Sequence, residues 1–172
     1  KILSSNSLKF INIGRFSYEK GHDMLIQAFE KFHSKNPDSY LIIIGGYGEL
    51  YNEMSQLAKN SSASENIVII KSMSNPMPIL KKCDLFILSS RYEGLGLTIL
   101  EADTLKIPVI STHICGPSGF MKAHGGYMVP PSVDGIYNGM IAFTNGKVGI
   151  MNVDYEQYNK LAAEEFEKLI SR

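Results

Sequence analysis

Short, wholly apolar runs recur along the chain, and each is followed by a segment with helical hydrophobic periodicity. The clearest runs are residues 41–44, 67–70 and 85–88. A strand that is apolar on both faces is typical of a parallel sheet buried between two layers of helices. Strands alternating with helices at this spacing predict an α/β fold with a doubly wound, Rossmann-like parallel sheet, and we expect the strand order 3-2-1-4-5-6.

The same patterns give approximate bounds for the other elements. The expected strands are 10–13, 41–44, 67–70, 84–88, 108–111 and 126–129, and the expected helices are 24–32, 49–59, 79–80, 97–105, 133–143 and 154–170. Apolar positions on the last helix are expected at Tyr155, Tyr158, Leu161, Ala162, Phe166 and Leu169. Residues 1–8 are polar, and we expect a linker there, with residues 9–172 forming one domain that includes the carboxyl-terminal helix.

Composition narrows the class of protein. Lysine plus arginine equals aspartate plus glutamate at 17 each among 172 residues. This balance argues against a strongly basic surface that would bind nucleic acid. The apolar runs are also too short to span a membrane. Cys83 and Cys115 are expected to be buried free thiols in a reducing compartment. We therefore expect a cytoplasmic protein.

The loop after the fourth expected strand, residues 89–96, carries two glycines and a carboxylate and leads into a helix. A helix that begins near Gly96 presents unpaired backbone N–H groups, which suit a phosphate. Gly94 and Gly96 allow an anion close to the backbone. Glu101 would lie roughly 8 Å along the helix, within reach of a ribose, and Glu93 on the other side of the phosphate. The alternative is a structural turn with a capping acid at Glu93 and a solvated Glu101.

The expected sheet brings a second loop to this place. In the order 3-2-1-4-5-6, strands 1 and 4 are neighbours at the switch point, and ligands bind outside their carboxyl ends. The loop after strand 1 carries Arg15 and Lys20. Two cations would then face the glycine loop at Glu93, which favours a diphosphate site. His22, just after Lys20, is expected either to cap or pack at a helix start or to border this phosphate site.

Several motifs in one order resemble a known family. They are Gly14-Arg15 with Lys20-Gly21, the segments 43–48 and 66–68, Ser89-Ser90-Arg91-Tyr92-Glu93-Gly94, Glu101-Ala102 and Pro108-Val109-Ile110. Over residues 9–131 they resemble the carboxyl-terminal, donor-binding half of glycosyltransferase family 4 (group 1), the retaining GT-B enzymes. The pair Glu93 and Glu101 would be the family's two spaced glutamates.

The resemblance implies a retaining glycosyltransferase that transfers a hexose-type sugar from a nucleotide-diphosphate sugar to a glycan or lipid-linked acceptor, in polysaccharide or glycoconjugate synthesis. Arg15 and Lys20 would bind the diphosphate, Glu101 the ribose, and Glu93 the donor sugar. Catalytic roles would fall to Glu93, Arg15 and Lys20. The donor-binding set would be Gly14, Arg15, Lys20, Glu93, Gly94, Leu95, Gly96, Leu97 and Glu101. A UDP-sugar is the first expectation for the donor and a GDP-sugar the second, with no cofactor and no metal.

The chain departs from the family pattern in two segments. Residues 103–107 stand where small residues and a glycine are usual, and residues 118–120 stand where an acid is usual. The resemblance implies that residues 1–8 link to a missing amino-terminal acceptor domain and that residues 9–172 are the nucleotide-sugar-binding domain, so we expect little or no transfer by the chain alone. Contact with the inner face of the cytoplasmic membrane would be peripheral and would belong to the missing half. A GT-B-fold nucleotide-sugar epimerase, a phosphorylase half and a non-catalytic nucleotide-binding module stay open as alternatives.

Overall fold

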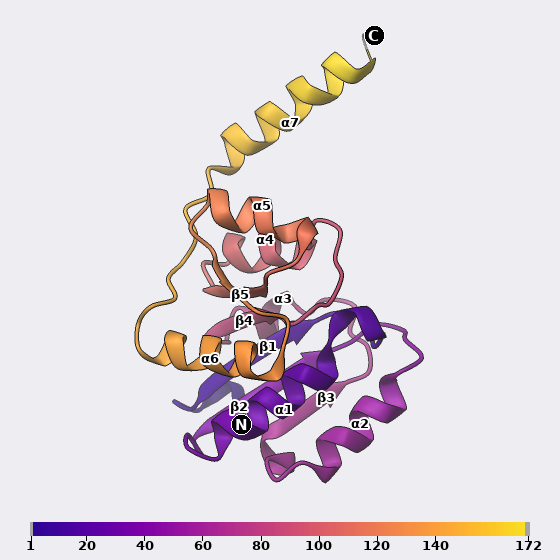
Figure 1. Cartoon of the computed structure of the whole chain (residues 1–172), viewed down its shortest axis with the longest axis vertical. Coiled ribbons are helices and arrows are strands. Elements are labelled where there is room, and N and C mark those ends of the chain that lie inside the picture. The colour runs from indigo at the N-terminus through magenta and orange to yellow at the C-terminus, as the bar shows by residue number, and fades with distance from the viewer. Residues whose placement is uncertain (1, 171–172) are drawn as a thin grey trace.

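Six parallel strands form one sheet, in the order β3-β2-β1-β4-β5-β6 (Figure 1). This computed structural model describes residues 2–170, apart from the side chains of 161, 165 and 169. The strands are β1 (Leu8–Ile13), β2 (Ser39–Ile44), β3 (Ile67–Ile70), β4 (Leu85–Leu88), β5 (Val109–Thr112) and β6 (Tyr127–Val129). The helices are α1 (His22–His33), α2 (Tyr51–Asn60), α3 (Met77–Leu80), α4 (Leu97–Thr104), α5 (Cys115–Ala123), α6 (Val133–Thr144) and α7 (Tyr155–Ile170), with 3-10 turns η1 (Ile2–Ser4), η2 (Tyr18–Lys20) and η3 (Ser64–Asn66). The predicted strand order is confirmed.

Two hydrophobic cores lie on the two faces of the sheet, because successive side chains of a strand point in opposite directions. Phe10 of β1 packs with apolar residues of α1, α2 and α6. Its neighbour Ile11 packs with apolar residues of α3, α4 and α5. Both residues are completely buried, as are the side chains of β4, so the short apolar runs are explained by burial on both faces.

Two segments differ from the sequence-based expectation. Strand β1 begins at Leu8, inside the segment expected to be a linker, and the ammonium of Lys9 is buried where it donates to the Ser5 carbonyl oxygen at 3.1 Å. Helix α5 was not among the expected elements, since two glycines and a proline within nine residues give little helical signal. The role of residues 1–8 as a link to a preceding domain stays a prediction.

Helix α4 turns a different face to the core than its leucines suggest. Ile99 and Ala102 are buried, whereas Leu97 is 65% exposed. The expected helix is confirmed, but Leu97 does not belong to its buried face, because residues in the first turn of a helix can project beyond the sheet that the helix covers. The result places an exposed apolar side chain beside the glycine loop.

Helix α7 extends away from the body of the molecule (Figure 1). Its start is attached, because the Tyr155 hydroxyl donates to the Asp103 carboxylate of α4 at 2.7 Å. Farther along, Ala162 is exposed and Phe166 is 63% exposed, so these two expected apolar contacts are not made within the described residues. The expected contacts of Leu161 and Leu169 fall on side chains outside the described residues.

A lysine occupies the position that ends α4. Lys106 has φ 60°, the left-handed conformation that side chains disfavour. The Ile107 N–H donates to the Ala102 carbonyl and the Lys106 N–H to the Asp103 carbonyl, at 3.0 and 2.8 Å. This is the bonding pattern of a Schellman cap, in which glycine is the usual left-handed residue. The departure from the family pattern at residues 103–107 therefore keeps the cap but adds backbone strain.

Replacing Lys106 by glycine is expected to raise the free energy of unfolding by about 1 kcal/mol, because glycine adopts this conformation without strain. Urea unfolding followed by circular dichroism would measure the change. The matched control is Lys122→Gly in the last turn of α5, where glycine is expected to lower stability. A loss of stability in Lys106→Gly would contradict this account of the cap.

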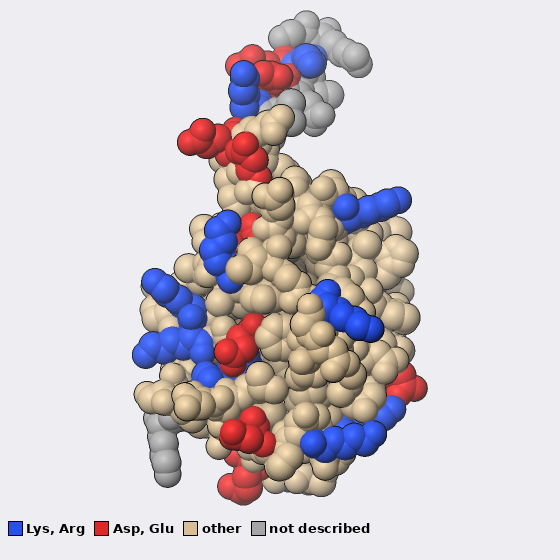
Figure 2. Space-filling model, turned by 90° about the vertical axis from the view of Figure 1, so that its left-hand side faces the viewer, with Lys and Arg blue, Asp and Glu red and all other residues tan. Residues whose placement is uncertain are grey.

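Charged side chains of both signs lie on the visible surface (Figure 2). Figure 2 shows lysine and arginine interspersed with aspartate and glutamate on one face, with no large field of one sign. This agrees with the formal net charge of +0. A search of the described residues for a helix long and apolar enough to cross a bilayer finds none.

Candidate functional site

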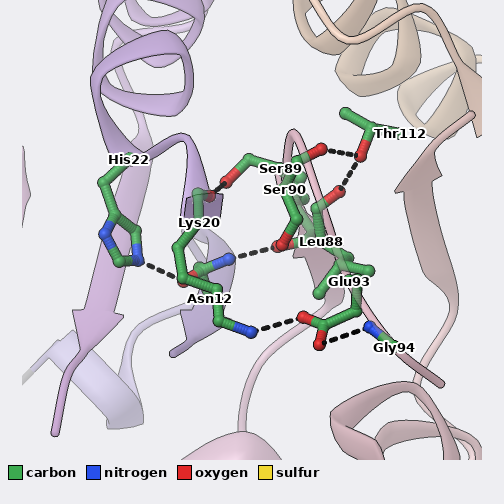
Figure 3. Close-up of polar contacts among 10 residues, drawn as sticks. Asn12, Lys20, His22, Leu88, Ser89, Ser90, Glu93, Gly94 and Thr112 are labelled. Carbon is green, nitrogen blue, oxygen red and sulfur yellow. Dashed lines mark hydrogen bonds and ion pairs between the residues drawn. The ribbon is translucent and has the colours of Figure 1, made fainter. Parts of the chain in front are cut away.

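The loops after β1 and β4 meet at the carboxyl edge of the sheet, as the strand order requires. The Lys20 ammonium forms an ion pair with the Glu93 carboxylate, and Figure 3 shows the two side chains directed toward each other. Their side chains are only 19% and 17% exposed. The carboxylate also accepts from the Gly94 N–H at 3.2 Å. The structure thus brings together the two predicted residues, which lie 73 positions apart in the sequence.

A buried polar pair lies beneath this ion pair, where β1 and β4 separate. The Asn12 side-chain amide donates to the Ile87 carbonyl at 2.7 Å, so its oxygen faces His22 Nε2 at 2.9 Å (Figure 3). An amide oxygen only accepts, so His22 Nε2 carries the proton. The Nδ1 atom of His22 is buried without a partner among the described residues. His22 is therefore packed in the core, as one of its two expected roles requires, and the role at the border of a phosphate site stays a prediction.

Burial lowers the pKa of His22 from 6.5 to about 4, and the nearby Lys20 ammonium adds to this effect. The folded protein thus binds this proton less readily than the unfolded chain, so the free energy of unfolding should fall as pH drops from about 6.5 to 4. The expected loss is about 3 kcal/mol at the acid end of this window.

Urea unfolding across this pH window would measure the effect in the wild type and in His22→Gln. The glutamine amide can still donate to Asn12 but does not titrate, so the variant should show a shallower pH dependence. Equal slopes in the two proteins would contradict the assignment of His22 as a buried neutral side chain.

The start of α4 forms one wall of a hollow beside Lys20. Gly96 is the residue before the helix and has φ 74°. The hollow is about 400 Å³ and is lined by Lys20, Glu93, Leu95, Gly96, Leu97 and Thr98. The first N–H groups of a helix have no partner within it and carry partial positive charge. An ammonium and a helix start thus face the same space, an arrangement that can bind an anion.

Four of the predicted site residues, Gly14, Arg15, Gly94 and Glu101, are not among the residues that line this hollow. Glu101 is exposed on α4, and Arg15 is exposed beside Gly46, where a Cβ would lie 3.7 Å from the Arg15 side chain. Arg15 takes part in none of the ion pairs between described residues. Gly14 lies under the Lys20 side chain, 3.3 Å from where its Cβ would be. Of the two predicted cations, Lys20 is thus paired with Glu93, whereas Arg15 is exposed and is one of the charges that lower the pKa of Glu19.

Glu93 borders a second hollow on its other side. This hollow is about 230 Å³ and is lined by Arg91, Tyr92, Glu93, Ile114 and Cys115. A Cβ at Gly116 would lie 1.7 Å from the Gly94 carbonyl oxygen, so only glycine allows α5 to approach the loop this closely. Cys115 is exposed at the start of α5, so the expectation that both cysteines are buried holds for Cys83 only.

Three buried hydroxyl and amide side chains that hold the site were not predicted. They are Asn12, Ser89 and Thr112. The Ser89 hydroxyl donates to the Lys20 carbonyl at 2.8 Å, and Thr112 donates to the Ser90 carbonyl at 2.5 Å (Figure 3). Polar residues at the ends of apolar strands were the available signal, but their partners lie far away in sequence.

Comparisons with known proteins agree with this fold. The sequence model of glycosyl transferases group 1 matches residues 2–162. The UDP-Gal:alpha-D-GlcNAc-diphosphoundecaprenol alpha-1,3-galactosyltransferase of Escherichia coli is 30% identical over 85% of this chain and 39% of its own length. The capsular polysaccharide biosynthesis glycosyltransferase CapM of Staphylococcus aureus is 29% identical over 92% of this chain and 36% of its own.

A solved structure has the same architecture. The carboxyl-terminal domain of the group 1 glycosyl transferase LpcC of Francisella tularensis superposes with a TM-score of 0.69, covering 81% of this chain and 77% of that one at 24% identity. The chain described here belongs to the group 1 glycosyltransferases, and its sheet matches the Rossmann-like carboxyl-terminal domains of GT-B enzymes. It spans 39% and 36% of the length of the two curated relatives.

Proposed function

We propose that this chain is the donor-binding, carboxyl-terminal half of a retaining glycosyltransferase of family 4. The whole enzyme would transfer a hexose-type sugar from a nucleotide-diphosphate sugar, with a UDP-sugar as the first candidate, to a glycan or lipid-linked acceptor. The observation that supports this most is the meeting of Lys20 and Glu93 at the start of α4. Relatives named for capsular polysaccharide and undecaprenol-linked sugar transfer support the class of acceptor.

Each side chain has a role that follows from its chemistry. Lys20 and Arg15 bind the diphosphate, while the N–H groups at the start of α4 bind its distal phosphate. Glu101 accepts hydrogen bonds from the ribose hydroxyls, one and a half turns farther along the helix. Glu93, which borders both hollows, contacts the sugar to be transferred.

The two cations supply the main electrostatic help to the reaction. When the bond between the sugar and the diphosphate breaks, negative charge develops on the departing phosphate. Lys20 and Arg15 stabilise that charge in a partly dry site, where such interactions are stronger than in water. In this scheme they replace a divalent cation, and the acceptor is held by another part of the full-length protein. The chain alone should bind donor weakly and transfer little sugar.

Ligand-observed NMR with UDP, GDP, ADP and CMP would test donor binding by this chain and by Glu101→Ala. We expect one diphosphate nucleotide to bind and the variant to lose that binding, which would also identify the base. Binding by none of them, to this chain or to the full-length protein, would contradict the proposal. Consumption of nucleotide sugar by the full-length protein without acceptor would favour the epimerase alternative.

The place of action follows from the same proposal. We place the whole enzyme in the cytoplasm, peripheral at the inner face of the cytoplasmic membrane. In that arrangement the membrane contact belongs to the part of the protein outside this chain. Fractionation of cells that express the full-length protein and this chain separately would test it, with the full-length protein expected at the membrane and this chain in the soluble fraction.

A further inference from the structure

Arg91, in the loop after β4, is joined to the first turn of α1 by a two-pronged ion pair. Its Nη1 and Nη2 atoms donate to Oδ1 and Oδ2 of Asp23 at 2.8 and 2.6 Å. Two parallel bonds of this kind fix orientation as well as distance. The guanidinium also lies over the Tyr18 ring, 4.4 Å from its centroid. We call Arg91, Asp23 and Tyr18 the interloop clasp.

The interloop clasp is reinforced by hydrogen bonds to successive carbonyls of η2. The Tyr18 carbonyl accepts from Arg91 Nη1 at 3.0 Å, and the Glu19 carbonyl accepts from the Arg91 backbone N–H at 2.6 Å. The Lys20 carbonyl accepts from the Ser89 hydroxyl at 2.8 Å. All three donors belong to the loop after β4, so that loop sets the position of the turn that carries Lys20.

The turn η2 needs this outside support. It has only three residues, and the side chain of Ser17, which precedes it, makes no capping bond. The two loops are also in close contact beside η2, as shown by Gly21: a Cβ there would lie 2.2 Å from the Ser89 carbonyl oxygen. Gly21 has φ 62°, so the close approach and the conformation both require glycine.

Neither Arg91 nor Asp23 lines the hollow beside Lys20, although Arg91 lines the second hollow on the other side of Glu93. We propose that they are positioning residues for the diphosphate, acting by holding the Lys20 ammonium at the start of α4. This inference rests on the proposed function. Binding energy at a charged site depends on geometry, and a shift of about 1 Å can cost up to about a hundredfold in the activity it supports.

Phosphorus NMR titration with pyrophosphate, which has no base and no sugar, tests this role. UDP is titrated in parallel. We expect Arg91→Lys and Asp23→Asn each to weaken pyrophosphate binding about tenfold, because lysine and asparagine cannot form the paired bonds. The double variant should lose no more affinity than either single variant, since all three variants break the same contact between Arg91 and Asp23. Lys31→Met, which breaks an exposed ion pair with Asp134 on the same helix α1, is the control and should bind normally.

A nitrogen NMR signal reports the proposed role more directly than affinity does. The Lys20 Nζ resonance should shift on addition of pyrophosphate to the wild type and shift much less in Arg91→Lys and Asp23→Asn. A general loss of stability would not produce this selective change. If Arg91→Lys fails to fold, the test is made with Asp23→Asn. That substitution removes a charge and leaves the shape of the side chain unchanged.

The outcomes separate three accounts of the interloop clasp. Equal affinity in the wild type and both variants would overturn the positioning role while leaving the proposed function in place. Tighter binding by Asp23→Asn would also overturn it, because it would mean that Arg91, once released, contacts phosphate itself. If the wild type binds neither pyrophosphate nor UDP, the proposed function fails and the positioning role fails with it.

Discussion

Replacing Lys20 by methionine is expected to weaken the binding of pyrophosphate and of UDP by about a hundredfold. Methionine keeps the length and apolar stem of the side chain but removes the ammonium that faces the start of α4. The loss of affinity has two causes: the ammonium no longer attracts the phosphates, and its ion pair with Glu93 is broken. The Glu93 carboxylate is then left uncompensated and repels the incoming phosphates.

Isothermal titration calorimetry would measure the change, with Lys31→Met as the matched control. Lys31 is also in an ion pair, but on the exposed surface of α1, and its replacement should leave both affinities unchanged. A second variant, the Lys20→Met and Glu93→Gln double replacement, should recover part of the affinity by removing the repulsion. Unchanged binding by Lys20→Met would remove Lys20 from the phosphate site.

Replacing Glu93 by glutamine is expected to have opposite effects on binding and on transfer. In the unliganded protein the Glu93 carboxylate is paired with the Lys20 ammonium, so a diphosphate must compete with Glu93 for Lys20. Glutamine removes that competitor and a like charge, and we expect UDP to bind this chain about tenfold more tightly. Transfer by the full-length protein should nevertheless fall by about a hundredfold, because Glu93 is proposed to contact the reacting sugar.

The matched control is Glu101→Gln, the same chemical change eight residues later. There the carboxylate is proposed to accept from the ribose hydroxyls, so UDP binding should weaken rather than tighten. Calorimetry on this chain and a product assay on the full-length protein would give the two readouts. Weaker UDP binding by Glu93→Gln would show that the Lys20–Glu93 pair does not compete with the diphosphate.

The strands could be predicted because their apolar runs are short-range signals. The meeting of the two loops could then be predicted from the strand order of a doubly wound sheet. Runs such as 41–44 are apolar on every residue, which requires burial on both faces. Once the sheet is doubly wound, the switch point follows from topology. Lys20 and Glu93 could therefore be expected to face each other before any contact was known.

The residues that hold the site loops in place could not be predicted, because their roles depend on contacts between segments that are distant in the sequence. Asn12 is an ordinary polar residue in the sequence, and only its approach to Ile87 and His22 gives it a role. Arg91 was part of a recognised motif, but nothing local indicates that its partner is Asp23, 68 positions earlier. These are tertiary bonds, and local periodicity carries no information about them.

Helix α5 illustrates a different limit. Its glycines lower intrinsic helix propensity, yet Gly116 is required where it is because the Gly94 backbone lies against it. Tertiary contact thus overrides a weak local preference. Lys106 is the reverse case, since the fold imposes a left-handed conformation that the residue itself disfavours.

The central claim is that a nucleotide diphosphate binds between Lys20 and the start of α4. Amide chemical-shift mapping of this chain with UDP, GDP and ADP in turn tests it most directly. We predict that the nucleotide that binds causes its largest shifts in residues 14–21 and 93–101. Largest shifts instead at the hollow between α2 and β3, lined by Tyr51, Ser55 and Lys59 among others, would contradict the claim.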